Sequence, residues 1–189
     1  MHQNYHLVRG TNRYGLIVDP GAANSLIGSQ TLNDFYTNVL QPRGLHIKSQ
    51  KSQATFSGIS GTTQSGVCLA TFPIGLQGLP EATFTTDVID GEGRYCPGLL
   101  PLCMVRYYRM SLYSDCLPHG DGILVMFPNW AKSNAGKPHF LQCFLTESSH
   151  YLLPIDEFDS PNNRQNHLKQ ALSQYLSTIL YEPKHAPRN

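Results

Sequence analysis

The sequence predicts a mainly β fold that ends in a β-hairpin and an amphipathic helix. Gly, Pro and Asn interrupt residues 1–130 about every 8–12 residues, which is the spacing of turns between short strands. The segments between these turns are rich in Val, Ile, Leu, Phe, Tyr and Thr. Near the C-terminus the apolar residues recur at helical spacing instead. These observations predict an all-β sandwich or barrel followed by a helix.

The N-terminal half is expected to begin with a hairpin in which Tyr5–Arg9 and Tyr14–Asp19 flank a turn at Gly10-Thr11-Asn12. A short strand is expected at Ser25–Ile27. Apolar residues then recur on one face of Thr31–Leu40, which predicts a helix that ends before a Pro-Arg-Gly turn. Further strands are predicted at Gln53–Phe56, Val67–Pro73, Thr83–Ile89 and Gly122–Phe127.

The composition changes after residue 128, and we place a domain boundary there, between residues 1–128 and an extension formed by residues 129–189. The extension starts with a polar loop. Two strand-like segments, Phe140–Thr146 and Tyr151–Ile155, then predict a hairpin closed by a turn at Glu147–His150.

A helix is predicted over residues 161–181, in the last part of the extension. Ser160 is expected as its N-cap and Pro161 as its first residue, a position that proline favours. An apolar stripe along a helix needs a partner, and packing on the same chain is the expected one. The stripe consists of Leu168, Leu172, Leu176, Ile179 and Leu180.

The charge composition argues against binding to polyanions. The chain has 189 residues with 14 Lys+Arg and 13 Asp+Glu, so its net charge is +1. A protein that binds nucleic acid or an anionic membrane would carry a basic patch, so neither is expected as a partner. No segment of about 18 apolar residues occurs, which excludes a membrane-spanning helix.

The five cysteines and the first residues bear on the compartment. The cysteine number is odd and the spacing irregular, which predicts reduced thiols rather than a disulfide framework. The first residues lack the basic-then-apolar layout of a secretory signal. We therefore expect an intracellular, cytoplasmic protein. The spacing of Cys and His does not predict a metal site, because no paired Cys-x-x-Cys completes one.

Residues 16–27 carry the strongest signal for chemistry. An apolar strand runs directly into Asp19, followed by Pro20 and Gly21 and then by a second apolar segment. A carboxylate at the end of a buried strand is costly unless it is hydrogen-bonded or functional. Gly21 would let the backbone approach this carboxylate and point an N–H group at it. Asp19 is therefore the candidate catalytic residue.

This segment resembles the active-site loop of the aspartic proteases, in which two hydrophobic residues precede Asp-Thr/Ser-Gly-Ala. The Gly-rich segment FSGISGTTQSG, residues 56–66, is similar to their flap hairpin. Pro97–Leu102 is similar to the apolar segment that closes the second half of proteases in retrotransposon polyproteins, and Gly120–Val125 would form the last strand. Because these parts occur in the family's order, the chain resembles the retropepsin-like proteases of long-terminal-repeat retroelements.

The resemblance implies a retropepsin-like acid-protease barrel over residues 1–128, with residues 129–189 as a C-terminal extension. It implies an aspartic-type endopeptidase that processes a retroelement polyprotein, with Asp19 as the catalytic residue and without a cofactor. The segment Gly58–Gly66 would cover the bound peptide. The residues implied to contact the substrate are Gly21, Ala22, Ala23, Gly58, Ile59, Ser60 and Gly61.

The chemistry of this family needs two carboxylates. Two aspartates about 3 Å apart share one proton, so that one activates a water as general base while the other polarises the scissile carbonyl. The sequence contains one Asp-x-Gly motif, which begins at Asp19. Asp90 and Asp121 do not form a second motif, since Gly follows each of them directly, and both are interpreted as turns. The resemblance therefore implies a homodimer with the Asp19 of each copy at the two-fold axis.

Two prolines depart from the family pattern. Pro20 stands where the family has Thr or Ser, whose hydroxyl bonds across the dimer, and Pro101 stands where Gly or Ser is usual. Three hypotheses follow. The chain is an active endopeptidase, or a catalytically weak or silent retropepsin-like module that dimerises or binds peptides, or an unrelated β domain in which Asp19-Pro20-Gly21 is only a turn.

Overall fold

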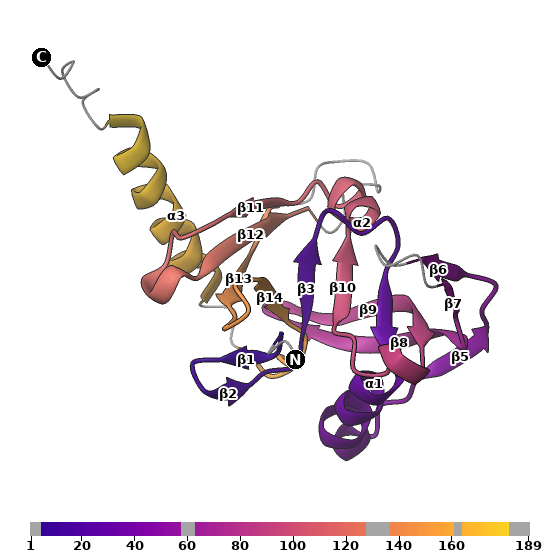
Figure 1. Cartoon of the computed structure of the whole chain (residues 1–189). Coiled ribbons are helices and arrows are strands. Elements are labelled where there is room, and N and C mark those ends of the chain that lie inside the picture. The colour runs from indigo at the N-terminus through magenta and orange to yellow at the C-terminus, as the bar shows by residue number, and fades with distance from the viewer. Residues whose placement is uncertain (1–4, 58–62, 128–136, 161–163, 182–189) are drawn as a thin grey trace, which may run out of the picture.

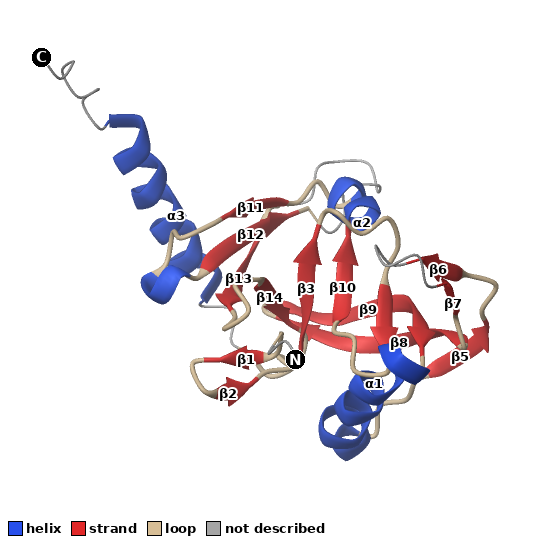
Figure 2. Ribbon diagram, viewed as in Figure 1, coloured by secondary structure: helices blue, strands red, loops and turns tan. Residues whose placement is uncertain are grey.

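Strands supply most of the regular structure, as predicted (Figures 1 and 2). The computed structural model describes residues 5–57, 63–127, 137–160 and 164–181. Within these ranges two main sheets and two small hairpins account for the strands, and three α-helices lie around them. The prediction of a mainly β fold is therefore confirmed.

A six-stranded sheet is built around β3 (Gly15–Asp19). Strand β10 (Gly98–Pro101) lies beside β3 in parallel, and β14 (Tyr151–Pro154) lies on its other side in antiparallel orientation. Strands from both sides of residue 128 thus belong to one sheet, which curls into a half-barrel. Beyond β14 follow β13 (His139–Leu145), β12 (Gly122–Met126) and β11 (Ser111–Tyr113).

A second sheet has four strands, and the long hairpin of β8 (Cys68–Leu76) and β9 (Leu79–Ile89) forms its centre. Strand β4 (Leu26–Gly28) pairs with β9 in parallel, and β5 (Lys48–Lys51) pairs with β8 in antiparallel orientation. Gly75 of β8 also pairs with the residue that follows β14 by two positions, Asp156, and this bridge joins the two sheets.

The N-terminal hairpin differs from the prediction. Strand β1 (Leu7–Val8) pairs with β2 (Thr11–Asn12), and the turn between them consists of Arg9 and Gly10, which both have positive φ, 48° and 76°. The predicted pairing of Tyr5–Arg9 with Tyr14–Asp19 is therefore wrong. The physical reason is that two distant strands, β10 and β14, pair with β3, so neither of its edges is left for the N-terminal strand.

The other predicted strands lie within a few residues of their expected positions. The C-terminal hairpin is confirmed, since β13 pairs with β14 across a turn between Thr146 and His150. Strands β5, β10 and β11 were not predicted as strands. Strand β5 consists of Lys, Ser, Gln and Lys, all exposed, so it carries no apolar alternation that would reveal a strand.

Helix α1 (Ser29–Phe35) continues through a π-turn at Tyr36–Leu40 and a 3₁₀ turn at Gln41–Arg43. It stops at Gly44, whose φ is 67°. The helix predicted over Thr31–Leu40 is confirmed and is longer at both ends. Helix α2 (Leu102–Tyr107) follows β10 without a connecting loop. Two further 3₁₀ turns lie at Gly91–Gly93 and Pro118–Gly120.

The main core lies between the two sheets and α1. Three buried rings, Phe35, Phe72 and Phe84, follow one another with centroid distances of 5.8 and 5.9 Å. Leu16 of β3 and Leu100 of β10 are buried in the same core. The strand that ends at Asp19 is therefore fixed by packing along its whole length.

Helix α3 (Arg164–Tyr181) packs on the six-stranded sheet as far as Leu176, and its last residues are exposed. Leu168 and Leu172 are buried against Ile123, whereas Ile179 is 53% exposed and Leu180 is 76% exposed. Figure 1 shows the second half of α3 running away from the sheets. The predicted start at Pro161 lies outside the described residues, and the Ser160 hydroxyl donates to the Glu157 carboxylate. None of the helices in the ranges given above is long and apolar enough to cross a membrane.

Leu168→Ala should lower the free energy of unfolding by about 2–4 kcal/mol, because it removes a buried side chain and leaves a cavity under α3. Leu180→Ala is the control on the same stripe and should change this free energy by less than about 0.5 kcal/mol. Urea denaturation followed by circular dichroism measures both values. An equal loss in the two variants would mean that the last residues of α3, around Leu180, are also packed.

Candidate functional site

Asp19 is the last residue of β3, and its Cα partner in the parallel strand β10 is Pro101. Figure 1 shows the two strands ending at the same edge of the sheet, beside α2. Leu16 and Ile17 of β3 are buried, Asp19 is half-buried, and Pro20 and Gly21 are exposed. A buried strand thus delivers one carboxylate to the surface.

The backbone after Asp19 turns back on the carboxylate. The N–H of Gly21 donates to Asp19 Oδ1 at 2.9 Å, and the N–H of Ala22 donates to the Asp19 carbonyl oxygen at 3.1 Å. A Cβ atom added at Gly21 would lie 3.1 Å from Asp19 Oδ1. Crowding against the carboxylate, rather than a positive φ, is therefore the reason for glycine at this position.

The loop is held at both ends by hydrogen bonds. The N–H of Leu102, the first residue of α2, donates to the Ala22 carbonyl oxygen at 3.2 Å. On the other side, the Ser25 hydroxyl donates to the Thr85 carbonyl oxygen of β9 at 3.1 Å. Ala23, the third loop residue of the predicted site, is exposed. The predicted residues Gly21, Ala22 and Ala23 therefore do lie beside Asp19 in one short loop.

Both prolines that depart from the family pattern are neighbours of Asp19. Pro20 follows it in the chain, and Pro101 lies next to it across the parallel pair. Neither proline has an N–H group. The donors around the turn are instead the backbone N–H groups of Gly21, Ala22 and Leu102, which all belong to the same chain.

The Gly-rich segment after β5 forms a hairpin, as predicted. Strand β6 (Thr55–Ser57) pairs with β7 (Thr63–Ser65), with Phe56 opposite Gln64. Four predicted substrate-contacting residues, Gly58, Ile59, Ser60 and Gly61, lie outside the described residues.

Asp90 and Asp121, the two aspartates interpreted as turns, have different environments. Asp90 lies at a turn, where its carboxylate accepts a hydrogen bond from the Ser29 hydroxyl at 2.6 Å. This bond and one from the Gly91 N–H lower the pKa of the Asp90 carboxyl. Asp121 also ends a turn, at Pro118–Gly120, but it is only 1% exposed and immediately precedes β12, and this burial was not predicted.

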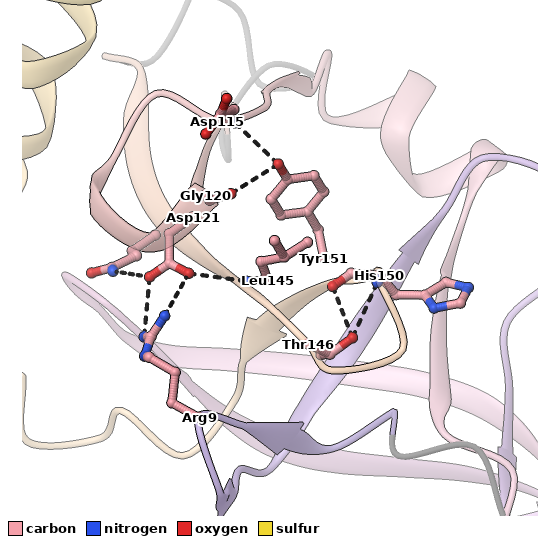
Figure 3. Close-up of polar contacts among 9 residues, drawn as sticks. Arg9, Asp115, Gly120, Asp121, Leu145, Thr146, His150 and Tyr151 are labelled. Carbon is pink, nitrogen blue, oxygen red and sulfur yellow. Dashed lines mark hydrogen bonds and ion pairs between the residues drawn. The ribbon is translucent and has the colours of Figure 1, made fainter.

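The Asp121 carboxylate is fully occupied by four donors (Figure 3). Oδ1 accepts from Arg9 Nη1 and from the Leu145 N–H, both at 3.0 Å, and Oδ2 accepts from Arg9 Nη2 at 3.2 Å and from Gln142 Nε2 at 3.0 Å. A carboxylate with all its acceptor positions taken has no free oxygen for a substrate. Asp121 therefore ties the β1–β2 turn to β12 and β13. Sequence reasoning missed it because Arg9 and Asp121 both stand next to glycines.

Two side chains close the loops around this ion pair (Figure 3). The Tyr151 hydroxyl donates to the Gly120 carbonyl oxygen and accepts from the Asp115 N–H, each at 3.0 Å. The Thr146 hydroxyl accepts from the His150 N–H at 3.1 Å and donates to the His150 carbonyl oxygen at 3.0 Å. The Thr146 bonds fix the β13–β14 turn, and the Tyr151 bonds fix the loop between β11 and β12, so both sets are structural.

The five cysteines are free thiols, as predicted. Burial raises the pKa of Cys96 to about 11, and burial also raises the pKa of Cys143 above its usual range. Thiols with a raised pKa are poor nucleophiles at neutral pH. These two cysteines are therefore packing residues rather than candidates for catalysis.

We also searched the described residues for a metal site and for a hollow that could hold a ligand. No group of three or more His, Cys, Asp or Glu side chains there is arranged to hold a metal ion. An open hollow of about 300 Å³ lies after β14, away from the Asp19 loop in the sequence, and burial raises the pKa of its Asp156 carboxyl. It is lined by Asp156, Glu157, Asp159, Ser160 and Arg164.

Comparison of the chain with protein-family models, with curated proteins and with solved structures found no match.

Asp121→Asn should lower the free energy of unfolding by about 3–5 kcal/mol, because an amide group would face the Arg9 and Gln142 donors in a buried site. The matched control is Asp159→Asn. Asp159 is paired with Arg43 at 3.4 Å, but its side chain is 89% exposed, so the loss should stay under about 1 kcal/mol. Chemical denaturation measures both, and similar losses would contradict the distinction between the two ion pairs.

Proposed function

We propose that this chain is a retropepsin-like aspartic endopeptidase that processes a retroelement polyprotein. The reaction is peptide-bond hydrolysis by a water held between the Asp19 carboxylates of a homodimer. The observation that carries the proposal is the placement of Asp19 at the exposed end of the buried strand β3, with one carboxylate oxygen oriented by the Gly21 N–H at 2.9 Å. The proposed fold is the acid-protease barrel, and the curled sheet around β3 supports it.

The proposed chemistry needs the second copy. One carboxylate takes a proton from the water as general base, and the other, which holds the shared proton, donates a hydrogen bond to the scissile carbonyl. Each chain contributes one such group, so a two-fold axis must bring the two Asp19 side chains together. No metal and no organic cofactor takes part in this reaction.

The surface around Asp19 suits a second copy of the chain. The exposed loop residues Pro20, Gly21 and Ala23 are small and uncharged. Helix α2, which is hydrogen-bonded to this loop, exposes Leu102 to 42% and Tyr107 to 56%. Exposed apolar side chains beside a half-complete site favour an isologous interface, in which the same patch packs on itself.

The β6–β7 hairpin is the proposed cover of the bound peptide. A peptide in an open cleft is wet, and a hairpin that folds over it would exclude water and offer backbone hydrogen bonds. The Gly-rich composition of residues 58–66 supports this role, because glycine lets backbone approach a ligand closely.

A second candidate function rests on the two prolines. Pro20 and Pro101 both adjoin Asp19, and neither can supply the hydroxyl that links the two loops in the family. A retropepsin-like module that dimerises or binds peptides, with weak or no cleavage, would keep the loop and the interface while losing the dyad's support.

Asp19→Asn should reduce the rate of polyprotein cleavage by about 100-fold to 10,000-fold, because the amide can neither accept the water's proton nor hold the shared one. The substrate is a polyprotein that contains this domain, and the products are followed by mass spectrometry. Asp90→Asn is the control. Asp90 is hydrogen-bonded to Ser29 at a turn, so this variant should cleave the polyprotein at the rate of the parent.

Three outcomes separate the functions. Parent-like cleavage by Asp19→Asn would contradict catalysis by Asp19. A cleavage rate of the parent that is flat from about pH 4 to about pH 9 would contradict a dyad with one shared proton. A dimer that binds but never cleaves the polyprotein would support the silent module instead.

Leu102→Asp should weaken dimerisation by at least about 100-fold, because it puts a carboxylate into an apolar interface opposite its own copy. Leu180→Asp is the matched control, since Leu180 is more exposed than Leu102 but lies at the exposed end of α3, away from the Asp19 loop in the sequence. Sedimentation velocity over a range of concentrations gives both dissociation constants. Loss of the dimer in Leu180→Asp alone would place the interface on α3 and contradict the proposed surface.

A further inference from the structure

The base of the β6–β7 hairpin is organised around one side-chain pair. The Ser52 hydroxyl donates to Asp87 Oδ1 at 2.6 Å and accepts from the Ala54 N–H at 3.1 Å. A short bond to a carboxylate is among the stronger hydrogen bonds in proteins. We refer to Ser52, Ala54, Gly66 and Asp87 as the hairpin base.

Gly66 closes the hairpin base from the other strand. Its N–H donates to the Ala54 carbonyl oxygen at 2.9 Å. A Cβ atom added at Gly66 would collide with the Ser52 hydroxyl, so glycine is needed here for the close approach. The next residue, Val67, donates from its N–H to the Val88 carbonyl oxygen of β9 at 2.7 Å.

The hairpin has little else to hold it. Strands β6 and β7 have three residues each and, in the part of the chain that the structure describes, pair only with one another. Figure 1 shows them beside β5 and β8, at the end of the four-stranded sheet. An isolated two-stranded hairpin is marginally stable in water, so its position depends on how its base is attached.

The same short segment of β9 also anchors the Asp19 loop. Asp87 is the Cα partner of Leu26, the first residue of β4. The Ser25 hydroxyl, one residue earlier, donates to the Thr85 carbonyl oxygen. The segment Thr85–Asp87 therefore holds the end of the Asp19 loop through the Thr85 carbonyl oxygen and the hairpin base through the Asp87 carboxylate.

We propose that the Ser52–Asp87 hydrogen bond locks the β6–β7 hairpin at a fixed angle to the Asp19 loop, which makes Ser52 and Asp87 positioning residues for peptide binding. The lock is a property of the fold, whereas its effect on peptide binding rests on the proposed function. Loss of the bond frees the hairpin to swing about its base and leaves Asp19 and its loop in place.

Hydrogen–deuterium exchange of the full-length chain tests the lock without any need for activity. Ser52→Ala should speed exchange of the β6 and β7 amides by about 10-fold to 100-fold, because a hydrogen bond to a charged group is lost at the base. Ser29→Ala is the matched control, since the Ser29 hydroxyl makes the same kind of bond to Asp90 at the same 2.6 Å, away from the hairpin. It should leave hairpin exchange unchanged.

Gly66→Ala tests the same bond from the other side. Its methyl group would push the Ser52 hydroxyl off Asp87, so this variant should match Ser52→Ala in hairpin exchange. Unchanged hairpin exchange in both variants would overturn the proposal. So would equal acceleration by Ser29→Ala, because the change would then be global rather than local.

The kinetic readout separates positioning from general stability. With the polyprotein-derived peptide as substrate, Ser52→Ala should raise KM by about 10-fold or more while kcat falls by less, since the cover is lost but Asp19 is not. Faster hairpin exchange with an unchanged KM would overturn the positioning role. If Asp19→Asn cleaves like the parent, the proposed function fails, and the exchange experiment still decides the lock.

Discussion

The structure depends on the burial of β3 between a parallel and an antiparallel neighbour. Strand β10 pairs with Leu16–Asp19 and β14 pairs with Gly15–Ile17, and the Leu16 and Ile17 side chains are buried. The last two residues, Val18 and Asp19, are half-buried. Because the strand cannot shift without breaking two sets of ladder bonds and unpacking its side chains, the sheet fixes the backbone of Asp19, and the Gly21 N–H orients its carboxylate.

What the sequence could predict follows from this burial. Local signals, such as the turn glycines, the apolar face of α1 and the spacing of the C-terminal helix, were sufficient for most elements and for the Asp19 loop. The partners of β3 were not predictable, because β10 and β14 lie far from it in the chain and no local pattern encodes which strands meet. The buried ion pair of Asp121 was not predictable for the same reason, since its four donors come from the N-terminal turn and from β13.

The two aspartates of greatest interest, Asp19 and Asp121, show how burial separates structural from available carboxyl groups. Asp121 gives both oxygens to four donors of its own chain, and such a group adds to stability only while every donor stays in place. Asp19 is half-buried and has its Gly21 contact on one oxygen. Within one chain, therefore, Asp19 keeps a carboxylate oxygen without a donor among the described residues, whereas Asp121 is a structural carboxylate.

The prolines beside Asp19 change which contacts order the Asp19 loop. In the family that this chain resembles, a hydroxyl after the catalytic aspartate links the two copies, so the loop becomes fully rigid only in the dimer. Here Pro20 has a fixed φ, and the N–H groups of Gly21, Ala22 and Leu102 close the turn within one chain. A restricted φ lowers the entropy that the loop loses on ordering. The order of the Asp19 loop therefore comes from its own chain, and the proposed dimer would have only to bring two such loops together.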